Sequence, residues 1–320
     1  MANGMPASEF VGRRVEADAP ATIANLGAGY DTLGLAVDLT LRATIEALPF
    51  AAGSSSVTLE VQGEGAGELA ADRSNRLVVA LESGLAELGV TGLDCVGWRI
   101  DMENPIPLER GLGSSAAATV AGLRAAAAIA NRPIDDGTLL RLATSIEGHP
   151  DNVAAAIHGG LTASIALEDR VDVVPLPAPA GVLVLAWIPD RRLPTNEMRR
   201  VLPTDVPRAD AVANLTRVAV GVAGLATGRV DVLALLTEDR LHEPYRAAVY
   251  PELPHLIAAA RDAGAVGACL AGAGSTVIAF VPANDLAVID RVGAAFQSIA
   301  GYLALPGRLA ELRPIATTAK

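Results

Sequence analysis

A long segment of small residues, SSAAATVAGLRAAAAIAN at positions 114–131, constrains the fold more than any other part of the sequence. Alanine has the highest helix propensity, so the segment is predicted to be one helix, which Asn131 and Pro133 would end. Its alanine and glycine side chains let such a helix pack closely against a sheet. The run GLG at 111–113 precedes it. The predicted helix therefore begins at Ser114, after a turn whose backbone can approach a ligand.

Strand and helix patterns alternate along the chain without an internal repeat, which indicates a mixed α and β fold. Strands are predicted at 13–25, 56–65, 161–167, 171–176, 181–189 and as a pair within 267–281, with a serine and glycine turn at 53–56. Helices are predicted at 75–89, near 196–237, at 252–263 and at 284–296, and the segment 135–160 is typical of two helices. These two separate at 148–150, because proline disfavours the helical conformation of the residue before it.

The proline-rich segment PLPAPAG at 175–181 is the predicted domain boundary. It divides the chain into an N-terminal domain at 1–175 and a C-terminal domain at 176–320. Strands and helices intermix on both sides of the boundary, so the predicted architecture is a two-domain α+β arrangement. Hydrophobic residues make up 51% of the 320 residues, which is ample to bury a core.

Charge and composition narrow the class of ligand. The formal charge of -11 argues against nucleic acids and anionic membranes as partners, and aromatic residues at only 3% argue against base-stacking platforms. Small molecules are therefore the favoured ligands. The only lysine is Lys320, the last residue. This argues against a Walker A loop, a protein-kinase site and a Schiff-base enzyme, because each needs an internal lysine.

The cysteines and the N-terminus indicate a compartment. Cys95 and Cys269 match no zinc or CxxC spacing, so both are expected as free, buried thiols in a reducing environment. The opening MANGMPASEF lacks a basic start followed by an apolar run, and no segment reaches the roughly 18 uninterrupted apolar residues that span a bilayer. The sequence therefore predicts a cytoplasmic protein with a disordered start.

The run GLGSSA at 111–116 has the composition of an anion cradle. A helix that begins at Ser114 leaves its first N–H groups unpaired and exposes its positive dipole end. The hydroxyls of Ser114 and Ser115 can reach a phosphate oxygen or a magnesium ion, so amides and a metal can take the place of a lysine. The alternative is a serine-capped helix after a tight turn, which is a common structure.

Glu147 ends a predicted helix and is followed by the polar run GHPDN at 148–152. Magnesium usually takes few protein ligands, and a carboxylate, a serine hydroxyl and nucleotide phosphates suit it. Glu147 is therefore the candidate metal carboxylate, with an exposed helix-end charge as the alternative. For His149 the alternative to a site role is a capping or core hydrogen bond.

Two further glycine-rich turns are weaker signals. Asn25 and Asp31 lie in a turn after a predicted strand, and Gly272 and Gly274 lie between two predicted strands. The glycines within 63–67 resemble half of a dinucleotide fingerprint, but a hairpin turn is predicted there, because no apolar helix follows directly. GxSxG does not occur, which argues against a hydrolase of the nucleophile-elbow type.

Six segments, taken in order, resemble the signature of the GHMP kinases and of their homoserine kinase branch. They are PATIANLGAGYDTLG, PLERGLGSSAAATVAGL, EGHPDNVAAAIHGG, LPTNEMR, EPYR and LAGAGST. GLGSSA is shared by the whole superfamily, whereas EGHPDN together with ANLGAGYDTLG is specific to the branch. Ala28, Ala271 and Ser275 depart from the usual proline, serine and proline.

The resemblance implies an N-terminal domain like domain 2 of ribosomal protein S5, a ferredoxin-like C-terminal domain, and a site between them. It implies ATP and Mg²⁺ as cofactors, with Ser115 and Glu147 holding the metal. The residues that it implies for ATP binding are Asn75, Pro107, Leu108, Arg110, Gly111, Leu112, Gly113, Ser114, Ser115, Ala116 and Ala117. Asn75 would lie near the adenosine.

The resemblance also implies phosphorylation of the L-homoserine hydroxyl, a step of threonine biosynthesis, with catalytic roles for Ser115, Glu147 and Arg246. The residues that it implies for L-homoserine binding are Asn25, Asp31, His149, Asp151, Asn152, Thr195, Arg199 and Arg246. Arg199 or Arg246 would take the substrate carboxylate and Asp31 the ammonium. A role for Asp151 as base stays open, because a loose transition state tolerates the lack of one.

Three alternatives accompany this interpretation. The chain could be another GHMP kinase, acting on mevalonate, a sugar or a cytidyl-diphospho alcohol, although a mevalonate kinase should offer an internal lysine. It could be a nucleotide-binding regulator that lost catalysis. Thr195 could be an ordinary N-cap, with Arg199 and Arg200 solvated on the outer face of a helix. The implied partners are small molecules, without nucleic acid or membrane, and with a homodimer as an option.

Overall fold

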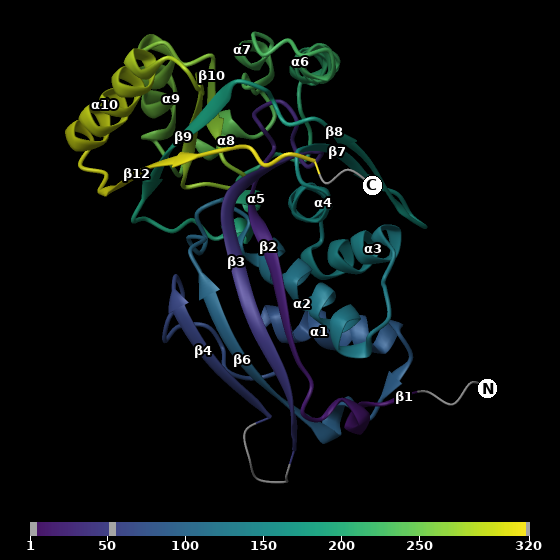
Figure 1. The fold of residues 1–320 in the computed structure, drawn as a ribbon. Helices are drawn as coiled ribbons and strands as arrows, with labels where there is room; N and C mark the ends of the chain where they lie inside the picture. Colours follow the sequence, from purple (N-terminus) through teal and green to yellow (C-terminus); the bar gives the residue numbers. More distant parts are fainter. Residues whose placement is uncertain (1–4, 51–55, 318–320) are drawn as a thin grey trace.

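The computed structural model describes residues 5–50 and 56–317, which form two main sheets (Figure 1). The strands of the first sheet are β2 (Arg14–Ala24), β3 (Leu33–Pro49), β4 (Val57–Gly63), β6 (Val96–Asn104), β7 (Leu161–Ala166) and β8 (Val171–Leu176). Strand β3, with 17 residues, is its centre, because it pairs antiparallel with β2 within 34–46, with β6 over 42–49 and with β7 over 33–35. The order is β4-β6-β3-β7-β8, and β2 pairs with β3 alone.

Four helices pack against one face of this sheet (Figure 1). They are α1 (Arg76–Glu87), α2 (Ser114–Ala130), α3 (Asp136–Glu147) and α4 (Asp151–His158). The alanine-rich α2 contacts both β2 and α1, as its small side chains allow. Gly148 ends α3 with a φ of 86°, in the left-handed region that favours glycine. The predicted helix at 114–131 and the predicted break at 148–150 are confirmed.

The second sheet is antiparallel throughout and has the strand order β10-β11-β9-β12. Its strands are β9 (Val182–Pro189), β10 (Gly267–Leu270), β11 (Val277–Pro282) and β12 (Gly307–Leu312). The helices between β9 and β10 are α5 (Thr195–Arg200), α6 (Arg208–Ala226), α7 (Leu233–Leu236), α8 (Glu243–Arg246) and α9 (Leu253–Asp262), and α10 (Leu286–Tyr302) connects β11 to β12. This strand order and the helical connections are ferredoxin-like. The predicted α+β fold is confirmed.

Strand β9 is buried along its whole length, because its two faces meet different cores. Val184, Ala186 and Ile188 join the core that continues into the first sheet. Leu183 and Leu185 pack instead with the helices α9 and α10. Burial on both faces explains why the sequence of β9 is an uninterrupted hydrophobic run rather than an alternating one.

Two predictions for the N-terminal half are wrong. Residues 5–10 are ordered, because β1 (Met5–Pro6) pairs with β5 (Val90–Thr91) and the side chain of Phe10 is fully buried. The glycines within 63–67 form no hairpin, since β4 and β6 are parallel and parallel strands need a crossover. Residues 1–4 and most of the turn predicted at 53–56 lie outside the described residues.

The two cysteines differ in environment. Cys269 is buried in β10, as predicted, whereas Cys95 is exposed, and that prediction is wrong. Cys95 ends a short 3-10 helix, Leu93–Cys95, in the surface connection that leads into β6. A connection of this kind has no second layer to cover it, so its side chains face water.

The C-terminal segment returns from β12 to the first sheet. Asp38 N donates to Arg313 O at 3.0 Å, and Ile315 N donates to Ala36 O at 3.0 Å. The two halves of the chain are thus joined at 177–181 and again by this returning segment. The domain limits 1–175 and 176–320 stay a prediction.

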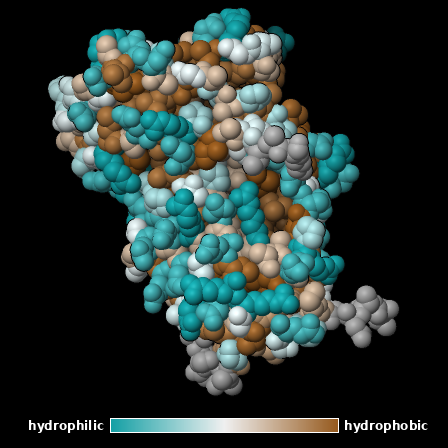
Figure 2. All heavy atoms as spheres, viewed as in Figure 1, coloured by the Kyte–Doolittle hydropathy of each residue, from teal (hydrophilic) through white to brown (hydrophobic). Residues whose placement is uncertain are grey.

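Helix α6 has an unusual surface. Within residues 5–50 and 56–317, it is the one helix long and apolar enough to span a membrane, a test that helices of soluble proteins also pass. Only 22% of its most apolar window is buried, and Val212, Leu215 and Val220 are exposed. Figure 2 shows hydrophobic side chains reaching the surface in the upper part of the view, where Figure 1 places the second sheet and its helices.

The contact between α1 and α2 can be tested at Gly122. A Cβ there would overlap the carbonyl oxygen of Leu77 and lie 2.8 Å from the Cβ of Ala80. We expect Gly122→Ala to lower the free energy of unfolding by about 1–3 kcal/mol. The matched control is Gly301→Ala in α10, where nothing lies within 4 Å of the added Cβ, and it should be stabilising by about 0.5–1 kcal/mol. Urea denaturation measures both, and equal shifts would contradict the close packing.

Candidate active site

The loop before α2 forms a cradle of backbone groups. Gly111 and Gly113 have φ values of 78° and 71°, in the left-handed region. A Cβ on Gly111 would overlap the carbonyl oxygen of Ala271, and one on Gly113 would overlap Thr22 Oγ1. Glycine is therefore required at both positions by conformation and by space. Among the described residues, the N–H groups of 114–116 have no hydrogen-bond acceptor, so they are available to an anion.

Glu147 lies beside this cradle. Ser115 Oγ and Thr119 Oγ1 each donate a hydrogen bond to Glu147 Oε1 at 2.8 Å, and Arg76 Nε lies 3.5 Å from the same oxygen. The Glu147 side chain is only 8% exposed. The alternative of an exposed helix-end charge is therefore wrong. The carboxylate is held in place by groups from α1 and α2, next to the free amides.

Two cavities meet at Ser114 and Ser115. The first has a volume of about 160 Å³ and is lined by residues of both sheets and their connections. The second has a volume of about 280 Å³, and Leu69, Met102 and Leu108 are among its apolar walls. An apolar cavity that opens onto an anion cradle can hold the base of a nucleotide while its phosphates lie at the helix N-terminus.

Asp31 and Arg199 form a bidentate ion pair at the edge of the first cavity. Arg199 Nη2 donates to Asp31 Oδ1 at 2.7 Å, and Nη1 donates to Oδ2 and to the Tyr30 hydroxyl, each at 3.0 Å. The interpretation of Arg199 as a solvated outer-face residue is therefore wrong. Thr195 is the first residue of α5 and lines the cavity, while Pro194 is the N-cap, so that alternative is also wrong.

Arg246 is a buried cation beneath the same cavity. The residue is only 1% exposed, and burial lowers the pKa of its guanidinium. Arg246 Nε donates to Met198 O at 3.3 Å, and Nη1 donates to Gly272 O at 2.9 Å. Asn25 Nδ2 donates to the same Gly272 oxygen at 2.9 Å. A buried positive charge that lines a cavity attracts an anionic group strongly.

His149 and Asp151 line the same cavity. His149 Nδ1 is 2.8 Å from Asp151 Oδ1, an oxygen that also accepts from Asn152 N at 2.7 Å. The hydrogen bond to Asp151 raises the pKa of His149, and burial opposes the rise. Asn152 Oδ1 accepts from Thr22 Oγ1 at 2.8 Å, which ties the start of α4 to β2.

The structure brings most of the predicted site residues together. Those that line the first cavity are Asn25, Asp31, Pro107, Gly111, Leu112, Gly113, Ser114, Ser115, Ala116, Glu147, His149, Asp151, Asn152, Thr195, Arg199 and Arg246. Asn75 and Leu108 line the second cavity. Arg110 and Ala117 line neither. Arg110 Nε donates to Pro189 O at 2.7 Å, so its side chain joins the cradle loop to the second sheet, and Ala117 is fully buried in α2.

Three residues that contact predicted site residues are missing from the predicted set, as is Glu109, which lines the first cavity. Thr119 follows Ser115 by one helical turn, so an i, i+4 comparison along α2 would have placed both hydroxyls on one face. Arg76 reaches Glu147 from another helix, and no local pattern signals that contact. Tyr30 lies beside Asp31 in the sequence, and its hydroxyl accepts from Arg199.

Comparison with known domain families agrees with this architecture. Residues 75–160 match the model for the GHMP kinases N terminal domain, and residues 224–298 match the model for the GHMP kinases C terminal domain. A phosphate cradle at a helix N-terminus, facing a second, ferredoxin-like domain, is the arrangement of a small-molecule kinase. The chain belongs to the GHMP kinase family.

Relatives that are about 40% identical over most of the chain are homoserine kinases. That of Moorella thermoacetica is 42% identical over 277 residues, which cover 87% of this chain and 90% of the relative. That of Thermus thermophilus is 39% identical over 282 residues, covering 88% and 92%. The crystal structure of homoserine kinase from Cytophaga hutchinsonii matches with a TM-score of 0.80 and 28% identity, covering 94% and 95%. The predicted homoserine kinase branch is confirmed.

The contact between His149 and Asp151 can be tested by the titration of His149. We expect Asp151→Asn to lower the pKa of His149, because the variant loses the charged acceptor that raises it. NMR titration of the imidazole resonances measures this, with the exposed His255 as an internal reference. An unchanged titration of His149 would contradict the contact.

The same pair makes stability depend on pH. The folded-state pKa of His149 is raised above the unfolded value of about 6.5. Its contribution to the free energy of unfolding is therefore complete below that pH and is lost as the pH rises through the folded pKa. In urea denaturation, the free energy of unfolding of the wild type should exceed that of Asp151→Asn by more at about pH 6 than at about pH 9.

Proposed function

We propose that the protein transfers the γ-phosphoryl group of ATP to the side-chain hydroxyl of L-homoserine, giving O-phospho-L-homoserine and ADP. One observation carries the proposal: the amide cradle, the Asp31–Arg199 pair and the buried Arg246 line a single cavity. A cradle alone suits many nucleotide-binding proteins. A fixed anion with two guanidinium groups beside it suits an α-amino acid, and the homoserine kinase relatives support that choice of substrate.

On the donor side, the free N–H groups and the dipole of α2 would hold the phosphates of ATP, with the base in the apolar cavity near Asn75. Ser115 and Glu147 fit a magnesium ion, because a hydroxyl and a buried carboxylate lie 2.8 Å apart at the edge of the cradle. Magnesium usually takes its other ligands from water and phosphates. When bound, it neutralises charge on the transferred phosphoryl group. Thr119 and Arg76 would keep Glu147 in position.

On the acceptor side, Arg246 and Arg199 would bind the carboxylate of L-homoserine, and Asp31 would bind its ammonium. Asp31 and Arg199 are now each other's partners, at 2.7 Å. A zwitterionic substrate would replace this one ion pair with two, so the charges lose no partner when the substrate binds. A neutral alcohol has no charges to offer, which favours an amino acid over other acceptors.

In the proposed transfer, the hydroxyl oxygen of L-homoserine bonds to the γ-phosphorus while the bond from that phosphorus to the ADP oxygen breaks, and the hydroxyl proton is released. Asp151 Oδ1 already accepts from His149 and from Asn152 N. Asp151 therefore serves to position His149. Because the transition state is loose, positioning and charge neutralisation can supply most of the acceleration without a base.

The alternatives fit these contacts less well. A kinase for mevalonate would need an internal lysine, and the only lysine of the chain is Lys320. A binding-only regulator would not need the acceptor wall formed by Asp31, Arg199 and Arg246. The proposal also includes a cytoplasmic location and ATP and L-homoserine as the partners, without nucleic acid or membrane. A homodimer remains an option within it.

An assay of ADP release tests the acceptor. With ATP and magnesium present, L-homoserine, L-serine, L-threonine and mevalonate are offered in parallel. We expect strong turnover with L-homoserine alone, because the paired charges suit an amino acid and the homoserine kinase relatives support this particular side chain. ATP binding without turnover of any of the four would overturn the assignment of the acceptor and leave the cradle intact.

Two variants test the roles of the acidic residues. Glu147→Ala should lower kcat at least about 100-fold, because the metal loses its carboxylate. Asp151→Asn should lower kcat by no more than about 10-fold, since only the positioning of His149 changes. Steady-state kinetics at saturating ATP and magnesium measures both. Comparable losses in the two variants would contradict a transfer without a base.

A further inference from the structure

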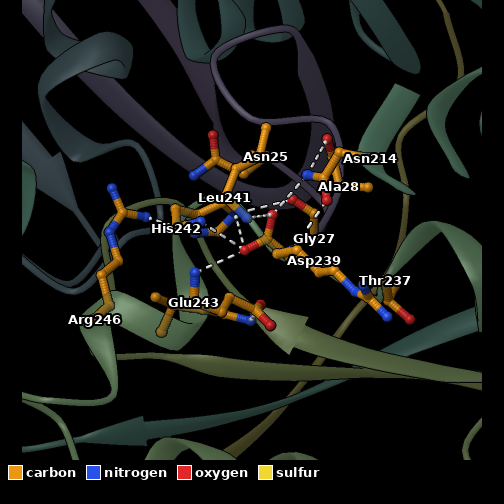
Figure 3. Close-up of polar contacts among 12 residues, drawn as sticks. Asn25, Gly27, Ala28, Asn214, Thr237, Asp239, Leu241, His242, Glu243 and Arg246 are labelled. Atoms are coloured by element: carbon orange, nitrogen blue, oxygen red, sulfur yellow. Dashed lines mark hydrogen bonds and ion pairs between the residues drawn. The ribbon is translucent and has the colours of Figure 1, made fainter. Parts of the chain in front are cut away.

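A buried chain of hydrogen bonds lies behind the acceptor wall and links Asn214 of α6, Asp239, His242 and Arg246 (Figure 3). Asp239 accepts from Asn214 Nδ2 at 2.7 Å and from the backbone N–H groups of His242 and Glu243 at 2.8 and 2.7 Å. These contacts fix the start of α8, the helix that carries Arg246. The side chains of Asp239 and His242 are both 0% exposed.

The ring nitrogens of His242 make two hydrogen bonds of opposite direction, and Nε2 also lies 3.8 Å from Asp239 Oδ2. His242 Nε2 lies 2.9 Å from Gly27 O, which can only accept a hydrogen bond, and His242 Nδ1 lies 3.0 Å from Arg246 Nη1, which can only donate. The ring therefore carries its proton on Nε2 and offers the Nδ1 lone pair to the guanidinium. Burial supports this neutral form, because it lowers the pKa of His242 to about 4.

These contacts leave one nitrogen of the Arg246 guanidinium, Nη2, for a ligand. Nε is engaged by Met198 O, and Nη1 by Gly272 O and His242 Nδ1. Over residues 5–50 and 56–317, Arg246 Nη2 has no hydrogen-bond acceptor, although Arg246 lines the cavity. The guanidinium is planar, so the contacts at Nε and Nη1 set the direction of Nη2.

Tyr30 connects His242 to the part of the acceptor wall that carries the negative charge of Asp31. The rings of Tyr30 and His242 are stacked, with centroids 5.1 Å apart. The guanidinium carbons of Arg246 and Arg199 lie 5.6 and 5.8 Å from the centroid of the same Tyr30 ring. His242 thus contacts Arg246 directly and, through Gly27 and Tyr30, the turn that carries Asp31.

We propose that His242 is a positioning residue of the acceptor site, whose Nδ1 holds Arg246 Nη1 and so directs Nη2 at the carboxylate of the acceptor. The inference rests on the proposed function. His242 is fully buried and lines neither cavity, so it acts on the acceptor through Arg246 and the turn at 25–31.

Two substitutions separate the contacts of the ring. The amide of His242→Asn lies near the position of Nδ1 and can accept from Arg246, whereas that of His242→Gln lies near Nε2 and can donate to Gly27 O. We expect His242→Gln to lower kcat/KM for L-homoserine about 10- to 100-fold, because a hydrogen bond to a charged group is lost. His242→Asn should stay within about 3-fold. The KM for ATP should not change in either, and equal losses in both variants would overturn the proposal.

A double-mutant cycle distinguishes positioning from a structural role. If His242 acts through Arg246, adding His242→Gln to Arg246→Ala should cause no further loss of kcat/KM. Additive losses would overturn the proposal. If Arg246→Ala leaves kcat/KM for L-homoserine unchanged, the proposed acceptor site fails instead, so the two failures are distinguishable.

A measurement on the unchanged protein covers the case in which a variant does not fold. The ¹⁵N shifts of His242 at neutral pH should show a proton on Nε2 and none on Nδ1. Saturating L-homoserine should shift the Nδ1 resonance, because Arg246 gains a partner, while ATP alone should not. A proton on Nδ1, or no response to L-homoserine, would overturn the proposal.

Discussion

Backbone hydrogen bonds between three segments of the chain hold the whole site together. Thr22 N donates to Leu112 O at 3.1 Å, Gly272 N donates to Ala24 O at 3.1 Å, and Thr276 N donates to Arg110 O at 3.2 Å. The segments are the end of β2, the cradle loop and the β10–β11 connection, so the bonds cross from one sheet to the other. Arg110 Nε adds a side-chain contact across the same boundary, to Pro189 O at 2.7 Å.

This close approach also sets the charge of the cavity. Its walls include the four carboxylates of Asp31, Glu109, Glu147 and Asp151, and the two guanidinium groups of Arg199 and Arg246. A nucleotide brings further negative charge to walls that are already negative, and the amides and dipole of α2 supply only partial positive charge. A cation beside the phosphates would offset this negative charge, which supports the proposal that Ser115 and Glu147 hold magnesium.

The parts of the fold that the sequence predicts correctly depend on local chemistry. The start of α2 follows from GLG and the alanines, and the end of α3 follows from Gly148 and Pro150. Strands β3 and β12 have no counterpart among the predicted strands, since their places depend on pairing with distant partners. The same limit explains the wrong predictions for the exposed Cys95 and for the parallel strand β4, because a short stretch of sequence determines neither burial nor strand direction.

The site residues divide in the same way into those predicted from local sequence and those that depend on distant segments. Spacing alone indicates the cradle and Glu147, whereas the acceptor residues are predicted through resemblance to a family, because they come from segments far apart in the chain. Arg110 shows what resemblance cannot supply. It lies inside the cradle motif, yet its guanidinium donates to Pro189 O at 2.7 Å and to Asp190 O at 2.9 Å. The direction of a side chain depends on what packs around it.

The surroundings of Arg246 explain why a histidine suits the place behind it. A carboxylate bonded to the guanidinium would also hold it, but would neutralise the charge that the proposed substrate carboxylate would meet. In the described part of the chain, no carboxylate lies within 4 Å of Arg246. Burial raises the pKa of the neighbouring Glu243 to about 8, so that group is mostly uncharged at neutral pH. A neutral imidazole thus orients the arginine and leaves its charge for the ligand.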